Sequence, residues 1–270
     1  MGWYSPTSPS ADLVDDVVCS WTARTDGTHL LVPDGCVDVL WIAGLGIRVC
    51  GPETVSWKFT LPVGTEAVGI RFRPGVVPRL LGESASAMRN QRVDLGALIG
   101  SAIDRELRDR LDNAVTDHGR QEIFENAVRR WRENRSAADP LVRGIALALA
   151  RSPGTVSDVA QRSGLTERQL LRRCSDAFGY GPATLRSILR LQRFMQVAQI
   201  RPQLSLADLA ATAGYSDQAH LSRNCRKISS MTPKELLASE APRWHGASSV
   251  LGDVRNIQSK STEDAAESAA

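Results

Sequence analysis

The sequence lacks the features that mark membrane, secreted and disulfide-stabilised proteins. No apolar run approaches the ~20 residues that a membrane-spanning helix needs, and the opening MGWYSPTSPS has neither the basic nor the apolar block of a secretory signal. The cysteines are odd in number, scattered and without a CxxC pair, which favours reduced thiols over disulfides or a zinc site; they are Cys19, Cys36, Cys50, Cys174 and Cys225. We therefore expect a cytoplasmic protein with no membrane contact, no metal and no cofactor.

What the chain does have is an uneven distribution of charge. Its 270 residues suit two domains, and a charged fraction of 23% is ordinary. Residues 141–240 hold 14 Lys and Arg against 7 Asp and Glu, whereas residues 1–140 hold 16 against 19. A basic segment of this kind is expected where a protein meets nucleic-acid phosphates, with a solvated basic face as the alternative.

The basic segment contains one short pattern twice. The first copy is TVSDVAQRSGLTERQLLRRC at 155–174, and the second is SLADLAATAGYSDQAHLSRNC at 205–225. Each begins with a hydroxyl residue that can cap a short helix, reaches a glycine where the chain must turn, and continues into a second capped helix. Thr166 and Gln169 fit a capping box at the second helix of the first copy. This order of elements predicts two helix-turn-helix units.

The second helix of each copy carries side chains suited to reading DNA. Arg and Gln have the hydrogen-bonding geometry that recognises guanine and adenine edges in the major groove. The predicted DNA-binding residues are Arg168, Gln169, Arg172, Gln218, His220, Ser222, Arg223 and Arg226. Between the units, Pro182 begins a predicted helix of about five turns that ends before Pro202. Such a helix would set the ~34 Å separation that two successive major grooves require.

Two units joined by a long helix resemble the AraC/XylS family of transcription regulators. The resemblance covers roughly residues 140–238 and is carried by GLTERQLLRRC, FGYGP and GYSDQAHLSRNCRKISSMTP. It implies a bacterial regulator, an activator with RNA polymerase as a partner, that binds double-stranded DNA. The chain departs from the family at Cys174 and Cys225, where a Phe is usual, and at Ser230, where a Gly is usual. These departures concern packing and a turn, because none lies on the predicted DNA-facing side.

Residues 1–95 read as β-rich. WTARTD, HLLVPDGCVDVLWIA, IRVCGP, SWKFTLPV and EAVGIRFRPG are runs of β-branched and aromatic residues separated by Gly and Pro. They predict a small barrel or sandwich. PDGCVD, GP and GIRFRPG resemble a poorly characterised β-rich domain that precedes such readers, which implies by analogy a small-molecule effector. The candidate contacts are Asp34, Asp38, Trp41, Trp57, Arg71 and Arg73.

Several of these candidates have a second interpretation. Arg71 and Arg73 alternate along one predicted strand, so they should share a face and suit an anionic ligand, unless that face is solvated. Asp34 precedes Gly35 in a turn signal. Cys36 and Cys50 could sense oxidants or, with His29, bind a metal, although no metal-ligand spacing is present and buried thiols are favoured.

Helical periodicity takes over after Ser84. Leu and Ile recur at helical spacing through 96–139, which we interpret as a helical connector that either mediates a homodimer or packs on its own domain. Residues 134–140 read as a linker, and 239–270 as a tail without fixed structure. The predicted fold class is therefore α+β: a β-rich domain at 1–95, a connector at 96–139 and an all-α DNA-binding domain at 140–238.

Three functions are consistent with the sequence. The favoured one is a sequence-specific transcription regulator with an N-terminal sensor, and not an enzyme. The second is a DNA-binding protein without a ligand, whose N-terminal domain only dimerises. The third is a DNA-targeted thiol enzyme that uses Cys36.

Overall fold

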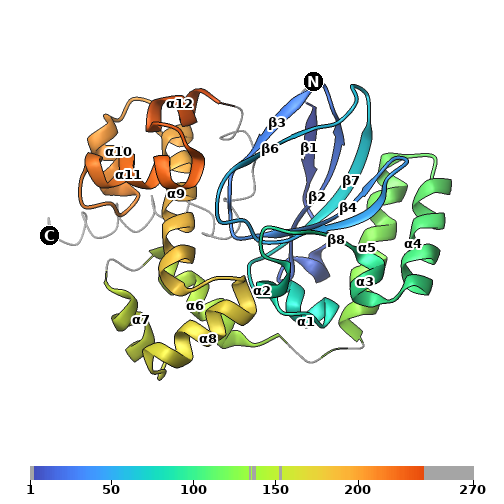
Figure 1. Cartoon of the computed structure of the whole chain (residues 1–270), viewed down its shortest axis with the longest axis horizontal. Helices are drawn as coiled ribbons and strands as arrows, with labels where there is room; N and C mark the ends of the chain where they lie inside the picture. The colour runs from blue at the N-terminus through green and yellow to red at the C-terminus, as the bar shows by residue number, and fades with distance from the viewer. Residues whose placement is uncertain (1–2, 134, 136–137, 152–153, 240–270) are drawn as a thin grey trace, which may run out of the picture.

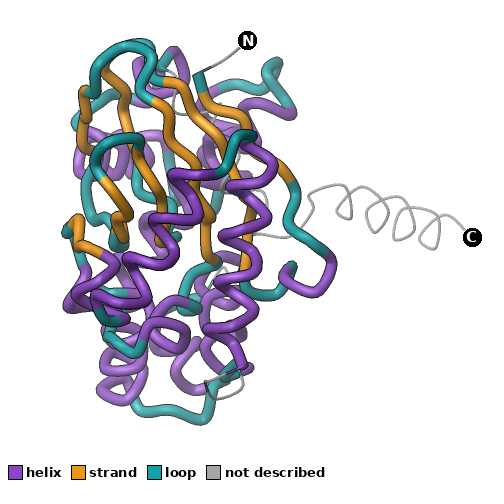
Figure 2. Tube along the Cα trace, turned by 90° about the vertical axis from the view of Figure 1, so that its right-hand side faces the viewer, coloured by secondary structure: helices purple, strands orange, loops and turns teal. Residues whose placement is uncertain are grey.

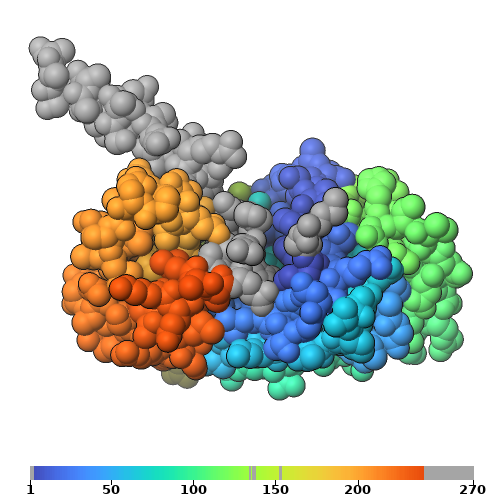
Figure 3. Space-filling view, turned by 90° about the horizontal axis from the view of Figure 1, so that it is seen from above, coloured from blue at the N-terminus to red at the C-terminus, as the bar shows by residue number. Residues whose placement is uncertain are grey.

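The structure is a computed structural model that describes residues 3–133, 135, 138–151 and 154–239 (Figure 1). It confirms the α+β class: a domain of strands and helices is followed by an all-helical domain. Seen from above, the orange and red helices of the second domain lie at one end, the green helices of the first at the other, and the blue strands between them (Figure 3). In the part of the chain described, no helix combines the length and apolar character that crossing a membrane requires.

The N-terminal domain is built on a six-stranded antiparallel sheet. Its strand order is β1 (Tyr4–Thr7), β2 (Val17–Arg24), β7 (Glu66–Phe72), β4 (Val37–Ile42), β5 (Gly46–Cys50) and β8 (Arg92–Asp94). A second pair, β3 (Thr28–Leu31) and β6 (Trp57–Thr60), forms its own small sheet. The predicted strand regions are confirmed, but HLLVPDGCVDVLWIA is split by a turn into β3 and β4, and β1 and β8 were not predicted.

Alternation along the strands divides the large sheet into two faces. On β4, Val39 and Trp41 point to one face, while Asp38 and Leu40 point to the other. Register extends this to β7, where Ile70 lies opposite Val39 and Arg71 lies opposite Asp38. We call the first the helix face and the second the cavity face.

The helix face is covered by α1 (Val77–Leu81), α3 (Leu95–Ile99), α4 (Ser101–Asn113) and α5 (Asp117–Glu133). In Figure 2 the two long purple helices, α4 and α5, cross in front of the orange strands. Leu111, Phe124 and Val128 are fully buried against this face, in one cluster with Val39 and Ile70. The predicted connector stripe therefore packs on its own domain, and Gly100, with φ of 94°, ends α3 and separates it from α4.

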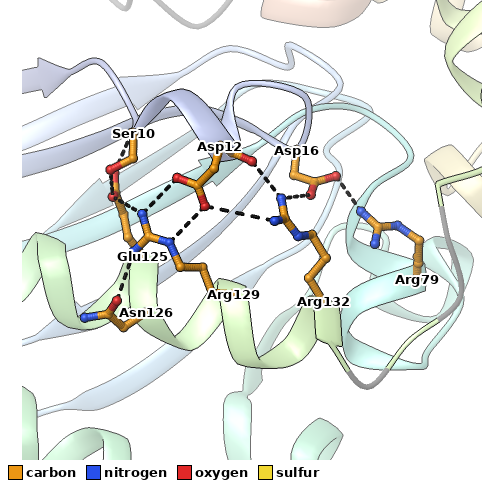
Figure 4. A network of polar contacts seen from close by, with 8 residues as sticks. All are labelled: Ser10, Asp12, Asp16, Arg79, Glu125, Asn126, Arg129 and Arg132. Carbon is orange, nitrogen blue, oxygen red and sulfur yellow. Dashed lines mark hydrogen bonds and ion pairs between the residues drawn. The ribbon is translucent and has the colours of Figure 1, made fainter.

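The segment before β2 is held on α5 by a polar network (Figure 4). Arg129 donates from Nε and Nη2 to the Asp12 carboxylate at 2.9 and 3.0 Å, which lowers the pKa of Asp12. The backbone N–H of Ser10 donates to Glu125 at 3.1 Å, and Arg79 pairs with Asp16. Between these contacts the short helix η1 (Ala11–Leu13) buries Leu13 completely. The network fixes α5 to the sheet domain, so α5 belongs to this domain and is not a free connector.

The C-terminal domain consists of seven helices in the described part of the chain. They are α6 (Pro140–Arg151), α7 (Val156–Arg162), α8 (Glu167–Phe178), α9 (Pro182–Ile200), α10 (Leu206–Thr212), α11 (Gln218–Ser229) and α12 (Pro233–Ala238). Thr155, Thr166 and Ser205 cap α7, α8 and α10, as predicted, and Asp217 caps α11. Gly164 and Gly214 have φ of 66° and 86° at the two turns, where the left-handed conformation favours glycine.

The three departures from the family pattern are accommodated locally. Cys174 and Cys225 are fully buried on the inner sides of α8 and α11. Ser230 adopts φ of 60° and ψ of 14° and ends α11 in the left-handed conformation that a glycine would otherwise supply. Of the predicted tail at 239–270, all but Ser239 lies outside the described part, as do residues 134, 136 and 137 of the predicted linker.

Candidate nucleic-acid interface and ligand cavity

The N-terminal half of α8 presents the first set of predicted reading residues. Arg168 and Arg172 are exposed, and neither has an ion-pair partner among the described residues. Gln169 is also exposed, but its Oε1 accepts the backbone N–H of Thr166 at 2.8 Å, which completes the capping box. Arg173 pairs with Asp139 at 2.9 Å, and Leu171 is 51% exposed. Arg168 and Arg172 are therefore the side chains of α8 that are most available to bases.

The helix α11 presents the second set, from Gln218 in its first turn to Arg226 in its last. Gln218, Arg223 and Arg226 are exposed, whereas His220 is half-buried beside Tyr215. The Ser222 hydroxyl donates to the Gln218 carbonyl at 2.9 Å, so it is already bonded within the helix. Arg223 forms no ion pair with Asp217 or with another acid within the described range. Its guanidinium is therefore exposed and unpaired at the surface of α11.

Each reading helix keeps its inner side in the core. Leu170, Cys174 and Phe178 of α8 and Leu221, Cys225 and Ile228 of α11 are buried. Asn224 is buried too, and its amide donates to the Tyr215 hydroxyl at 2.7 Å and to the Ser187 carbonyl of α9 at 3.0 Å. The bond from Asn224 to the Ser187 carbonyl fixes the rotation of α11 on α9. It therefore also fixes which side chains of α11 face outward.

The helix α9 connects the two units, with α8 near one end and α11 near the other (Figure 1). Its arginines Arg186, Arg190 and Arg193 are half-buried. Burial lowers the pKa of all three guanidinium groups. Their placement in the helical packing makes them weaker candidates for phosphate contact than the exposed arginines of α8 and α11.

The C-terminal end of each reading helix is bound to the N-terminal domain. Past the end of α8, the Gly179 carbonyl accepts a hydrogen bond from Arg89 at 3.2 Å, and α2 (Ala85–Met88) packs on α8. A Cβ at Gly179 would lie 2.6 Å from Pro52, so only glycine allows this approach. At the end of α11, the Ile228 carbonyl accepts the backbone N–H of Ser56 at 2.7 Å. Pro52 and Ser56 belong to one loop, residues 51–56 between β5 and β6, so this loop contacts both reading helices.

The middle of α9 is bound to the N-terminal domain as well. The buried Gln192 side chain donates to the Pro33 carbonyl at 2.7 Å. Leu185 and Tyr180 lie against Gly35 of the same turn, and one apolar cluster runs from Trp21 and Cys36 into the helical domain. The two domains are therefore joined through a shared core as well as through polar contacts.

A cavity of about 190 Å³ lies between the cavity face and the small sheet of β3 and β6. Five aromatic side chains line it: Trp3, Tyr4, Trp21, Trp57 and Phe59. Aliphatic residues of β2, β4 and β7, namely Ala23, Leu40, Ile42 and Ala67, form another part of the wall. The Trp21 ring lies across Gly69, where a Cβ would come within 2.3 Å of it, so the glycine shapes this wall. A smaller space of about 50 Å³ adjoins it through Asp38, Cys50 and Arg71 and reaches Gln192 of α9.

The charged groups in the wall are paired with one another. Arg71 bonds Asp38 through Nε and Nη2 at 3.1 Å and lies 3.3 Å from Asp34. The Asp38 carboxylate also accepts the Trp21 indole N–H at 2.8 Å. Burial raises the pKa of Asp34, against the pull of Arg71.

At the other end of the cavity, the Arg92 guanidinium lies 3.5 Å from the centre of the Trp57 ring and 2.7 Å from Glu53. Burial raises the pKa of Glu53 to about 7, although Arg92 opposes the shift. Arg48 pairs with Asp94. Because Cys50 and Trp57 of the cavity wall flank the 51–56 loop, the wall continues directly into the segment that contacts α8 and α11.

Comparison with known proteins gives two family matches. A helix-turn-helix domain model matches residues 159–239, and a model described as a domain of unknown function (DUF6597) matches residues 6–94. The chain carries an AraC-type helix-turn-helix domain. It is accordingly a DNA-binding transcription regulator. No curated protein matches the chain significantly.

Among solved structures, the chain is similar to ToxT from Vibrio cholerae. A 1.65 Å structure of ToxT is 10% identical, covers 81% of this chain and 97% of its own, and has a TM-score of 0.46. A structure of ToxT from Vibrio cholerae O395 bound to (E)-4-(8-methylnaphthalen-1-yl)but-3-enoic acid is 11% identical, covers 80% and 97%, and has a TM-score of 0.44. A third, of unsaturated fatty acid bound ToxT from strain SCE256, is 10% identical, covers 79% and 96%, and has a TM-score of 0.39.

Two predicted effector contacts of the AraC-type regulator lie away from the cavity. Trp41 is on the helix face, where its indole N–H donates to Asp112 of α4 at 2.7 Å and its ring faces Arg120. Arg73 follows the end of β7 and donates to the Val14 carbonyl at 2.7 Å. The prediction that Arg71 and Arg73 share a face is wrong, because the strand ends at Phe72 and the alternation stops there.

The other predicted contacts lie in or beside the cavity. Asp38, Trp57 and Arg71 line it, and Asp34 lines the adjoining space. Asp34 also accepts the Cys36 backbone N–H at 2.8 Å, as a turn-forming aspartate does. Sequence reasoning missed Trp3, Tyr4, Trp21, Phe59, Arg48 and Arg92. Alternation within WTARTD and SWKFTLPV could have indicated Trp21 and Phe59. Trp3 lies next to β1 and Arg92 begins β8, and no local sequence pattern predicted these two strands.

The cysteines of the regulator are buried or half-buried thiols. Burial raises the pKa of Cys36 well above its ordinary value and that of Cys50 to about 12. His29 lies against Trp3 and 3.1 Å from Asp26. A reactive thiol needs a lowered pKa and access, so the placement of Cys36 argues against the thiol-enzyme interpretation.

Proposed function

We propose that the protein is a sequence-specific transcription regulator that reads DNA with α8 and α11 and responds to a small molecule held in the cavity of its N-terminal domain. The observation that carries the proposal is the arrangement of the reading helices. Each exposes two arginines that have no ion-pair partner within the described residues, and its C-terminal end is fixed to the N-terminal domain. Recognition helices of this class contact bases with their N-terminal residues.

Five of the predicted DNA-binding residues form most of the proposed DNA-contacting surface. Arg168, Arg172, Gln218, Arg223 and Arg226 are exposed and not engaged in ion pairs within the described part of the chain. Gln169, His220 and Ser222 are closer to structural roles, because each bonds a backbone group or a neighbouring side chain. We assign base contact to the first group and positioning to the second.

The effector response is supported by the continuity between cavity and reader. The 51–56 loop begins beside Cys50 and ends beside Trp57, both in the cavity wall, and it contacts the ends of α8 and α11. A ligand that shifts Trp57 or Arg92 would therefore change how firmly the two reading helices are held relative to each other. Activation, RNA polymerase as a partner, a homodimer and a cytoplasmic bacterial location remain predictions from the resemblance.

The test of DNA reading is Arg223→Ala. Loss of a bidentate base contact costs about 1–3 kcal/mol, so affinity for a DNA site selected by the wild type should fall about 5- to 150-fold, with much less change on unrelated DNA. Fluorescence anisotropy titration at fixed salt measures both affinities.

Lys234→Ala in α12 is the matched control, because Lys234 is an exposed cation outside the reading helices. It should leave the ratio of specific to nonspecific affinity unchanged. An equal loss on both DNAs in Arg223→Ala would assign Arg223 to phosphate contact, and no loss on either would remove α11 from the interface.

A further inference from the structure

We infer that the cavity of the N-terminal domain binds an uncharged, largely apolar molecule with an aromatic ring, and not the anion that its arginines suggest. The inference rests on the proposed effector response and specifies its ligand. It follows from the size of the cavity, the composition of its wall and the pairing of every charged group around it.

The charged side chains around the cavity are paired with one another, which disfavours an anionic ligand. Arg71 is shared by Asp34 and Asp38, Arg92 pairs with Glu53, and Arg48 pairs with Asp94. Each of the three arginines thus already has a carboxylate beside it, with which an anionic ligand would have to compete. A carboxylate that took Arg71 would leave Asp34 or Asp38 buried without its partner, which is strongly unfavourable.

A cation is disfavoured for a different reason. Asp38 is the carboxylate that lines the cavity itself, and it already accepts from Arg71 and from the Trp21 indole. A ligand ammonium would have to compete with a buried guanidinium that holds two bonds to the same group. Bidentate pairs of this kind are among the stronger interactions in proteins.

The remaining wall favours an apolar ring. Trp3, Tyr4, Trp21, Trp57 and Phe59 surround the space, and the Tyr4 hydroxyl is already within 3.8 Å of the Cys19 thiol. Few polar groups are left to orient a sugar or another polyhydroxylated ligand. Apolar cavities stay dry, and one of ~150 Å³ in another protein accepts benzene. A cavity of about 190 Å³ therefore has room for one aromatic ring with a small substituent.

The test uses the full chain and four probes of one shape: toluene and benzyl alcohol, which are uncharged, benzoate, an anion, and benzylammonium, a cation. Binding is measured by isothermal titration calorimetry and by the shift in the unfolding temperature. We expect both uncharged probes to bind at least tenfold more tightly than either ion, and to raise the unfolding temperature at concentrations where the ions do not.

Two variants locate the binding. Ala67→Leu places a larger side chain in the cavity wall and should abolish the shift caused by toluene. Lys58→Ala, between Trp57 and Phe59 but exposed on the outer side of β6, should retain it. A single cooperative unfolding transition of Ala67→Leu in the absence of probe shows that the variant is folded. A toluene shift that persists in Ala67→Leu would overturn the assignment to this cavity.

The outcomes separate the ligand class from the effector response. If benzoate or benzylammonium binds best, and Ala67→Leu abolishes that binding, the uncharged class is overturned while the cavity remains an effector site. If none of the four probes binds, the inference is overturned and the effector response loses its support. DNA reading is tested independently by Arg223→Ala, so this result would not affect it.

Discussion

The two faces of the six-stranded sheet carry similar side chains but are closed in different ways. On the helix face, Trp41 donates to Asp112 at 2.7 Å, and on the cavity face Trp21 donates to Asp38 at 2.8 Å. On the helix face α1, α3, α4 and α5 fill the space, while on the cavity face the β3–β6 pair lies across the cavity from the sheet. The helix face of the sheet is therefore part of a close-packed core, whereas the cavity face borders a space large enough for a ligand.

This difference indicates where the sheet provides stability and where it provides a site. A close-packed interior loses free energy when any buried atom is removed. A wall that borders an empty space has already lost part of that packing. Substitutions of one type should therefore change the stability of the protein by unequal amounts on the two faces.

The largest difference is expected for removal of a phenylalanine. Phe124 of α5 is fully buried against the helix face, so Phe124→Ala should lower the free energy of unfolding by about 3–5 kcal/mol. Phe59 of β6 is only half-buried beside the cavity, so Phe59→Ala should cost about 1–2 kcal/mol. Urea unfolding of the two variants measures both values. Equal losses would mean that the cavity face is as tightly packed as the helix face.

A smaller effect is expected when side chains are enlarged at neighbouring positions of β7. Val68 is fully buried on the helix face, so Val68→Phe should overpack it and cost about 1–3 kcal/mol. Ala67 lines the cavity, so Ala67→Leu should be neutral or slightly stabilising, because the added methyl groups enter empty space. The unfolding temperatures of the pair give the comparison. Destabilisation by both would contradict a cavity at Ala67.

The smallest effect concerns the link from the cavity face to the reader. Gln192→Leu removes the donor to the Pro33 carbonyl and should cost about 1 kcal/mol, the usual net contribution of one hydrogen bond. Because this bond joins the domains, the two should also begin to unfold separately in differential scanning calorimetry. Gln199→Leu, an exposed position on the same helix, is the control and should keep a single transition. A single transition in both variants would show that the shared apolar core alone couples the domains.

The two domains also differ in how well local sequence predicted them. Caps at Thr155, Thr166 and Ser205 and the turns at Gly164 and Gly214 are signals within a few residues of the structure they specify. They were sufficient to predict both helix-turn-helix units and the length of α9. In the N-terminal domain the strands were predicted, but their order β1-β2-β7-β4-β5-β8 was not, since no local pattern encodes which distant strands pair.

The sequence by itself therefore determined the reading helices and the side chains that they expose, because helix capping, turns and periodicity act over short distances along the chain. Only the tertiary structure decided that Arg71 is neutralised by Asp34 and Asp38, that Trp41 lies in a solid core while Trp57 borders a cavity, and that the 51–56 loop meets the ends of α8 and α11. Each of these depends on which face of the sheet the helices cover and on contacts between residues far apart in the chain. Those contacts are decided by the packing of the whole domain and not by any short segment.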